Sequence, residues 1–177
     1  YLTVDTPVFF DFLDVSARMR SLDTERTLSG KEGPFYGQFT RFLVRLESKL
    51  TDKRYEFLFR PKNYRSSDTF PSLLTRLFAL DSNKRVTIID LSRVPFDVIN
   101  VLVSLLGRII FDFNVWNEAR HDFPILVVFE EAHAYLSTSG KSHAARKTVE
   151  RIAKEGRKYG VSCMIISQRP AEISETI

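Results

Sequence analysis

The sequence predicts an α/β fold with a mostly parallel sheet in its second half. Three short apolar runs rich in Val and Ile, "RVTIID", "PILVVFEE" and "GVSCMIISQ", are expected to be strands. Their apolar residues are continuous rather than alternating, which is typical of parallel strands covered on both faces by helices. Longer helical patterns separate the three runs, as in alternating β and α units.

Length and composition are ordinary for a globular protein: 177 residues, 44% hydrophobic and 27% charged, enough for a substantial core. The net charge of +4 is compatible with a polyanionic partner. Cys163 is the only cysteine, which excludes an intrachain disulfide and a cysteine-based metal site. No uninterrupted apolar run reaches the roughly 18–20 residues of a membrane span, and no signal-peptide pattern opens the chain. We therefore expect a cytoplasmic protein with no membrane partner.

Residues 1–80 are predicted to form a helical subdomain, and residues 81–177 the α/β unit. The first helix is expected over Pro7 to Met19, with Thr6 and Pro7 as start signals. The polar stretch "RSLDTERTLSGKEGP" then predicts a connector. The further expected elements are a helix over Phe35–Leu50 with an apolar stripe at Phe39, Phe42, Leu43, Leu46 and Leu50, a short strand at "RYEFLFR", a loop over Pro61–Pro71 and a helix over Leu73–Ala79.

Two longer helices are predicted in the second half. Phe96 to Trp116 is apolar on most of its faces, which favours a helix buried over most of its surface. His143 to Tyr159 is amphipathic, and Gly160 is placed to end it. The expected core face of this second helix carries Ala145, Val149, Ile152 and Ala153.

Polar side chains follow the three predicted strands. In open parallel sheets, ligands bind outside the carboxyl ends of the strands. A nucleotide-hydrolysing site needs a carboxylate for Mg²⁺, a base for the attacking water and a polar group near the γ-phosphate. A solvated strand end beside a helix N-terminus is the alternative for an isolated Glu pair, but matching polar tips on the neighbouring strands favour the site. The tip residues are Asp90, Glu130, Glu131, Ser167 and Gln168.

Three separated motifs, in order, carry a family resemblance. "ILVVFEEAHAYL" followed by "RIAKEGRKYGVSCMIISQRPAEIS" resembles the bacterial members of the HerA family, in the FtsK–HerA branch of P-loop ATPases. "VTIIDLSRVPFDVINVLVSLLGRIIFDF" is similar to the family's segment ahead of the acidic strand. The resemblance covers about Val86 to Ile177, and the first half resembles the family's helical insertion more loosely. It implies a RecA-like core that binds ATP and Mg²⁺, assembles as a hexamer and translocates double-stranded DNA with a nuclease or other effector.

The resemblance also implies roles for single residues. Glu130 is the Walker B carboxylate near Mg²⁺, where many relatives carry Asp, and Glu131 is the catalytic base. Gln168 matches the glutamine near the γ-phosphate. Arg157 lies where the family supplies an arginine finger to the neighbouring subunit's nucleotide.

The chain departs from the family pattern because it has no P-loop. "TSGKS" contains Gly140, Lys141 and Ser142, but Tyr135 stands where G-x-x-x-x-G-K-[ST] needs its first Gly. This stretch also follows the acidic strand on a loop, so we reject it as a Walker A motif. The sequence is expected to be the later part of a longer chain, to hold half of an ATP site and to be inactive alone.

Several polar residues have two interpretations. Asp90 either supports the Mg²⁺ site from behind its ligands or caps the strand end with Ser92. Ser167 joins the polar strand tips as a nucleotide-binding residue. His133 either orients Glu131 or reports on DNA, or is a structural histidine after a strand. A metal role for His133 is not expected, because no second ligand is suitably spaced.

Basic residues near the acidic strand also allow two interpretations. One helix face is either a solvated surface balanced by Glu150 and Glu155 through i, i+4 pairs, or a subunit or DNA contact. The small, polar loop "STSGKSHAAR" is expected to contact DNA phosphates without sequence specificity. The basic helix face comprises Lys147, Arg151, Lys154 and Lys158, and the loop residues are Lys141, His143 and Arg146.

Three functions compete. The leading one is a hexameric ATPase that translocates double-stranded DNA in DNA processing or defence. The alternative is a ring scaffold with weak turnover that organises an effector partner, against which the intact ATPase residues argue. An unrelated P-loop phosphotransferase is the third, and a strictly monomeric active protein would favour it.

Overall fold

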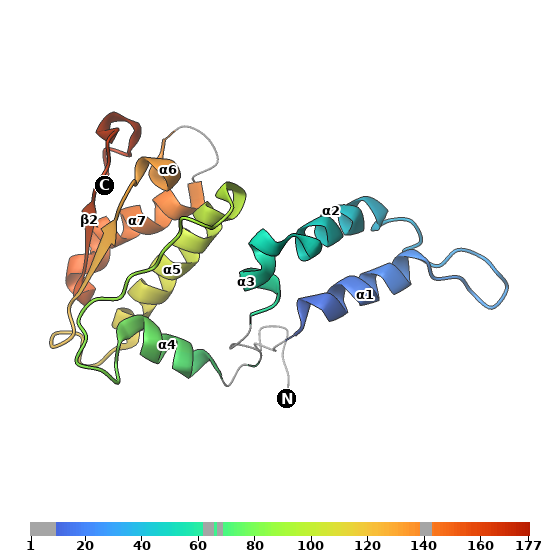
Figure 1. The fold of residues 1–177 in the computed structure, drawn as a ribbon, viewed down its shortest axis with the longest axis horizontal. Helices are drawn as coiled ribbons and strands as arrows, with labels where there is room; N and C mark the ends of the chain where they lie inside the picture. The colour runs from blue at the N-terminus through green and yellow to red at the C-terminus, as the bar shows by residue number, and fades with distance from the viewer. Residues whose placement is uncertain (1–9, 62–65, 67–68, 139–142) are drawn as a thin grey trace. The chain divides into compact units, whose positions relative to one another are not determined.

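The structure is a computed structural model that describes residues 10–61, 66, 69–138 and 143–177. It divides into two compact units, Tyr1–Arg93 and Val94–Ile177, called here the N-terminal unit and the C-terminal unit (Figure 1). The sequence-based division into residues 1–80 and 81–177 stays a prediction for the whole protein.

The described part of the N-terminal unit is helical. Its helices are α1 (Phe12–Asp23), α2 (Thr40–Thr51), α3 (Glu56–Phe59) and α4 (Phe70–Phe78), with the 3₁₀ turn η1 (Lys53–Tyr55) between α2 and α3. The start expected at Pro7 lies outside the described residues, and within them α1 begins at Phe12. Asp11 fixes this start because its side chain accepts a hydrogen bond of 2.8 Å from the Leu13 amide.

The apolar stripe predicted for the second helix is confirmed in its central part. Leu43, Leu46 and Leu50 are buried in α2, whereas Phe42 is exposed. The start of α2 depends on a contact that its own sequence does not contain. The buried Asp23 carboxylate accepts hydrogen bonds from the Phe39 amide (2.6 Å) and from the Thr40 hydroxyl (2.7 Å), and so caps α2 from the end of α1.

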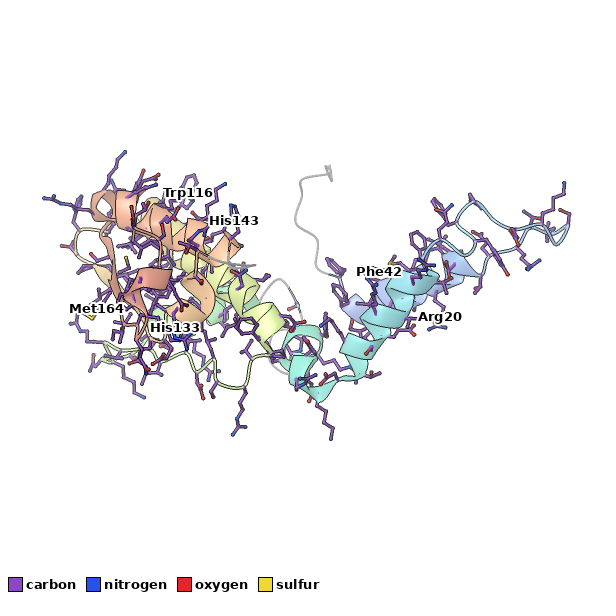
Figure 2. All side chains as sticks on the ribbon, turned by 90° about the horizontal axis from the view of Figure 1, so that it is seen from above. Arg20, Phe42, Trp116, His133, His143 and Met164 are labelled. Atoms are coloured by element: carbon purple, nitrogen blue, oxygen red, sulfur yellow. The ribbon has the colours of Figure 1, made fainter. Side chains whose placement is uncertain are left out.

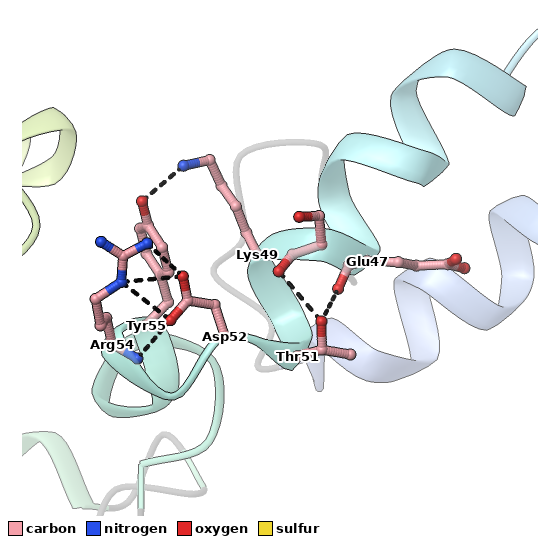
Figure 3. Close-up of polar contacts among 7 residues, drawn as sticks. Glu47, Lys49, Thr51, Asp52, Arg54 and Tyr55 are labelled. Atoms are coloured by element: carbon pink, nitrogen blue, oxygen red, sulfur yellow. Dashed lines mark hydrogen bonds and ion pairs between the residues drawn. The ribbon is translucent and has the colours of Figure 1, made fainter.

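The short strand expected at "RYEFLFR" is wrong, because this segment forms η1 and α3. Asp52 starts the turn by accepting from the Arg54 amide at 2.9 Å and pairs with its guanidinium group at 2.7 Å. Tyr55 is buried, and its hydroxyl accepts a hydrogen bond of 2.8 Å from Lys49 Nζ (Figure 3). These contacts stabilise a helical turn in a sequence whose composition alone suits a strand.

The strand expected at "RVTIID" is also wrong in this structure. The described residues 83–91 form no strand, and Val86 and Ile88 are exposed. A strand needs a neighbouring strand to accept and donate its backbone hydrogen bonds. The helices described in the N-terminal unit offer none.

The C-terminal unit alternates helices with a parallel pair of strands. The strands β1 (Ile125–Phe129) and β2 (Val161–Ile165) pair in parallel, from Ile125 opposite Val161 to Phe129 opposite Ile165. This pairing confirms the predicted parallel α/β arrangement. The helices and turns of the unit are α5 (Phe96–Trp116), α6 (His133–Leu136), α7 (His143–Glu155), η3 (Gly156–Tyr159) and η4 (Pro170–Glu172).

One face of the two-stranded sheet is covered within the C-terminal unit and the other is open. Phe129 and Val161 are buried on the covered face, where α7 contacts β2. The open face is apolar apart from Ser162, and no described element of the C-terminal unit covers it. Its apolar side chains, which are 45–55% exposed, are Leu126, Val128, Met164 and Ile166, with Met164 labelled in Figure 2.

Helices α5 and α7 pack against each other through small and polar residues. Ser104 Oγ lies 2.9 Å from Thr148 Oγ1. At Gly107 an added Cβ would come within 2.8 Å of the Thr148 methyl carbon, so a glycine allows the close approach. Near the start of α7, the Ala145 amide donates a hydrogen bond of 2.9 Å to Asn100 Oδ1. These contacts hold α7 in a fixed register on α5.

By length and composition alone, α5 passes the test for a membrane span, with a mean hydropathy of 1.7, and it is the one helix to do so among the described residues. Core helices of globular domains pass the same test. Arg108 and Asp112 interrupt its apolar sequence, and it packs one face against α7. Val101, Leu105 and Trp116 are exposed, so the expectation of a helix buried over most of its surface is wrong for the described residues.

The turn before β2 is tightly determined. Asn114 is fully buried and donates hydrogen bonds to the carbonyl groups of Phe123 (3.1 Å) and Tyr159 (3.0 Å). Gly160 ends the preceding turn with φ +70°, which confirms the predicted stop. Ala153 is exposed rather than on the core face of α7. This turn sets where β2 begins and therefore where its tip lies.

Candidate functional site

The candidate site begins where β1 ends. Glu130 and Glu131 follow Phe129 directly, and both are exposed. Glu131 has φ +48°, a left-handed backbone that Ala79 alone shares among the described residues other than glycine. This conformation costs about 1–2 kcal/mol for a residue with a Cβ. It turns the chain from β1 into α6, where the Ala132 amide donates to the Ile166 carbonyl at 3.1 Å.

The Glu131 carboxylate has a partner on each oxygen. Gln168 Nε2 donates to Oε1 at 3.2 Å, and His133 Nδ1 lies 3.5 Å from Oε2. Ser167 Oγ lies 3.3 Å from the same His133 nitrogen. The structure thus brings together Glu131 and His133 after β1 with Ser167 and Gln168 after β2. The adjacency predicted from parallel strand tips is confirmed for these two strands.

Glu130 is anchored through its backbone. Tyr135 Oη donates a hydrogen bond of 2.6 Å to the Glu130 carbonyl. Burial, together with the negative charges of Glu130 and Glu131, raises the pKa of the Tyr135 hydroxyl to about 12. Sequence reasoning missed Tyr135, because an aromatic residue in "AHAYL" carries no signal beyond that of an ordinary core residue.

The site suits a magnesium ion that takes most of its ligands from water and phosphate and few from the protein. Glu130 offers one exposed carboxylate at the strand tip. Within the described ranges no cluster of three or more His, Cys, Asp or Glu side chains could hold a metal ion. Mg²⁺ characteristically keeps most of its waters and uses one or two carboxylates together with substrate phosphates. Glu130 therefore suits this mode of binding and no fully protein-built cage.

Arg157 lies at the other end of the strands. It is exposed in η3, directly before β2, whereas the carboxylates follow the far ends of the strands. The four steps along β2 from Val161 to Ile165 span about 13 Å. The structure therefore does not bring Arg157 together with Glu131 and Gln168 in the same chain.

Asp90 belongs to the N-terminal unit and caps a turn. Its Oδ1 accepts a hydrogen bond of 2.9 Å from the Ser92 amide. Hydrogen bonding from Ser92 lowers the pKa of the Asp90 carboxyl. The expected contact with Ser92 is confirmed, but it caps a turn rather than a strand end, because no strand precedes Asp90. A role for Asp90 beside the nucleotide stays a prediction.

The residues expected to contact DNA differ in their surroundings. Lys141 lies outside the described residues, as do Gly140 and Ser142. His143 is exposed at the start of α7 (Figure 2). Arg146 donates to the Thr138 carbonyl at 3.2 Å and lies 3.8 Å from Glu150, so its guanidinium group faces its own chain. DNA binding by these residues stays a prediction.

The basic face of α7 carries balancing contacts. Arg151 lies 3.7 Å from Glu155, its i, i+4 partner, and 3.8 Å from Asp112. Its guanidinium carbon is also 4.3 Å from the centre of the Phe111 ring. These contacts support the interpretation of a solvated, internally paired surface for this residue.

Comparison with known proteins relates the chain to DNA repair helicases. No protein-family model matches it. It is 40% identical over 97 residues to the DNA double-strand break repair helicase HerA of Sulfurisphaera tokodaii, covering 52% of this chain and 19% of that protein. The HerA of Sulfolobus acidocaldarius is 38% identical with the same coverage of both chains. That of Pyrococcus furiosus is 46% identical over 55 residues, covering 31% of this chain and 10% of that protein.

The chain spans about a fifth of the length of the first two relatives. The parallel strand pair agrees with the α/β class that the sequence predicts. The acidic tip of β1 and the polar tip of β2 meet at one edge of this pair, as predicted. About half of the chain is similar to these HerA helicases, and the similarity implies a P-loop NTPase fold for that half.

Proposed function

We propose that the protein containing this chain is an ATP-driven motor that moves double-stranded DNA. It acts as a hexameric ring in the cytoplasm, together with a nuclease or another effector. The relatives named as DNA double-strand break repair helicases support this proposal. The observation that carries it is the hydrogen bond between Gln168 and Glu131, which joins the tips of β1 and β2.

Each tip residue has a role in ATP hydrolysis under this proposal. Glu131 accepts a proton from the attacking water, and Gln168 leaves Glu131 to contact the γ-phosphate. Glu130 holds Mg²⁺ through its water shell, with Ser167 as a further polar group of the site. The ion, when bound, supplies positive charge to the phosphates. The left-handed backbone at Glu131 supports a functional role, because strained residues cluster at active sites.

Arg157 acts on a neighbouring subunit under the same proposal. It is exposed at the amino end of β2, about 13 Å along the strand from its own tip. A long cation at that position is free to reach a nucleotide bound by another copy. A ring provides such a neighbour for every subunit.

The test is the ATPase rate of the full-length parent protein, with and without double-stranded DNA. We expect DNA to stimulate turnover and Glu131→Gln to lower kcat about 10²- to 10⁴-fold, the usual contribution of a general base. Glu118→Gln is the matched control, because Glu118 is an exposed carboxylate of the same unit outside the site. Its rate is expected to equal that of the wild type.

Other outcomes favour the competing functions. A wild-type protein that forms rings without turnover would overturn the motor and favour a scaffold that organises an effector. Turnover that ignores DNA would remove DNA as the substrate. Full activity in a strictly monomeric protein would favour a phosphotransferase, since no subunit boundary would then exist for Arg157.

A further inference from the structure

His133 contacts the Glu131 carboxylate from the first turn of α6. We propose that His133, supported by Ser167, is a positioning residue that fixes the orientation of this carboxylate toward the attacking water. The inference rests on the proposed role of Glu131 as the base. It assigns the histidine a part in turnover that acts through the Glu131 carboxylate.

Two oxygens face one nitrogen of His133. An ionised carboxylate can only accept a hydrogen bond, so the 3.5 Å contact with Glu131 Oε2 restrains the carboxylate in the tautomer that carries a hydrogen on Nδ1. Ser167 Oγ lies 3.3 Å from the same nitrogen and accepts a hydrogen bond of 3.1 Å from the Arg169 amide. The backbone of Arg169 therefore fixes Ser167, and Ser167 stabilises the ring of His133 beside Glu131.

The His133 side chain is more buried than the Glu131 carboxylate that it orients. The His133 side chain is 21% exposed, whereas that of Glu131 is 58% exposed. An exposed Glu side chain that loses its partner gains rotamer freedom, which favours orientations unsuited to the reaction. Gln168 restrains only Oε1, and under the proposed function it leaves when the nucleotide binds. His133 on Oε2 is then the remaining restraint on the base.

Anchoring of α6 supports this role. The Ala132 amide donates to the Ile166 carbonyl at 3.1 Å, and the Ala134 amide donates to the Glu131 carbonyl at 2.9 Å. His133 lies between these two anchored residues, so its backbone is fixed relative to both strand tips. A rigid support of this kind is what a positioning residue requires.

The experiment uses the full-length parent protein with saturating double-stranded DNA. We expect His133→Ala to lower kcat about 10- to 100-fold, the loss that follows a displacement near 1 Å in a reacting group. The KM for ATP is expected to stay unchanged, because the lost contact orients a base and binds no substrate. His121→Ala, at an exposed histidine of the same unit, is the control with wild-type rate.

Two further substitutions separate positioning from a structural role. His133→Asn can place an amide N–H near the position of Nδ1 and is expected to restore most of kcat. His133→Leu fills a similar volume without a donor, so it keeps the thermal stability of the protein while kcat stays low. A leucine variant with wild-type kcat would overturn the inference.

Glu131→Gln distinguishes failure of the inference from failure of the proposed function. Turnover that survives Glu131→Gln would remove Glu131 as the base and with it the proposed mechanism of hydrolysis at the strand tips. Turnover that collapses in Glu131→Gln but is unchanged in His133→Ala would leave the motor standing and overturn the positioning role alone. We expect His133→Ala to have no further effect in the Glu131→Gln background, because there is then no base to orient.

Discussion

At the scale of single residues, Tyr135 links the acidic tip of β1 to α6. Its hydroxyl donates to the Glu130 carbonyl, and its ring packs 6.3 Å from that of Phe129, centre to centre. A buried phenol beside two carboxylates resists ionisation, which is why its pKa rises to about 12. Because of Tyr135, the stability of the C-terminal unit is expected to change with pH in the alkaline range.

The sign of this dependence follows from the raised pKa. In the unfolded chain the phenol ionises near its ordinary pKa of about 10, and in the folded chain near 12. The stabilisation by the neutral phenol is complete below about pH 10 and is lost as the pH rises toward 12. We expect a loss of at most about 2 kcal/mol, since solvent screening reduces the full value. Urea denaturation between pH 8 and 12 measures it.

Tyr135→Phe is the matched control, because it removes the ionisable group and keeps the ring. The variant is less stable at pH 8, having lost the hydrogen bond to Glu130, by about 1 kcal/mol. The difference between the two proteins should shrink above pH 10 and reverse in sign near pH 12, because the wild type loses up to about 2 kcal/mol and gains only about 1 kcal/mol from the hydrogen bond. A constant difference over that range would contradict the raised pKa.

At the scale of elements, the register between α5 and α7 depends on one glycine and one threonine. Gly107 lies where any Cβ would meet the Thr148 methyl carbon at 2.8 Å, and the Thr148 hydroxyl lies 2.9 Å from that of Ser104. The methyl group thus fills the space left by the glycine, while the hydroxyl bonds across the interface. Both functions of Thr148 can be separated by substitution.

Gly107→Ala is expected to destabilise the chain by about 1–3 kcal/mol, because the interface is overpacked. Adding Thr148→Ser removes the obstructing methyl group and keeps the hydroxyl, so the double variant should recover at least half of that loss. The free energy of unfolding of the four proteins in this cycle, measured in urea, gives the coupling directly. Additive effects would show that α5 and α7 move apart in Gly107→Ala, so that the new methyl group does not clash with Thr148.

The same scale separates what the sequence could predict from what it could not. The bounds of α5 and the strands β1 and β2 follow from local patterns, and Gly160 marks the turn between α7 and β2. The segments "RYEFLFR" and "RVTIID" have compositions that suit strands, but a strand also requires a partner, which no local pattern reveals. In the first of them, contacts of Tyr55 with Lys49 select a helical turn instead.

Prediction of the site was limited in the same way. Parallel topology alone places Glu131 near Gln168, so that contact could be predicted. The choice between an orienting and a structural His133 required the actual distances to Glu131 and Ser167. Tyr135 could not be found, because a hydroxyl bound to a backbone carbonyl leaves no mark in the sequence.

At the scale of the whole molecule, the open sheet face is the main feature of the C-terminal unit. In a complete P-loop NTPase sheet both faces are covered, so the four apolar side chains of this face would be buried. We expect the double substitution Val128→Thr and Met164→Thr to leave the isolated chain as stable as before and to reduce its aggregation. Val128 and Met164 are opposite each other on the paired strands, so the change is confined to one face.

The full-length parent should respond differently to the same double substitution. If its remaining segments cover this face, burying two hydroxyl groups there costs about 2–6 kcal/mol and lowers the melting temperature. The matched control is Ser162→Thr, an exposed and already polar position on β2. Equal tolerance in the isolated chain and in the parent would mean that the face stays open.

The left-handed backbone at Glu131 also has a consequence for selection. Gly and Asn adopt φ +48° at lower cost than Glu, so either residue would make the turn after β1 more stable. A library diversified at this codon and screened for thermal tolerance alone should therefore be enriched in Gly and Asn. A screen that demands ATP turnover should return Glu. Comparing the thermal stability of the variants from the two screens would measure how much stability the protein loses by keeping Glu at position 131.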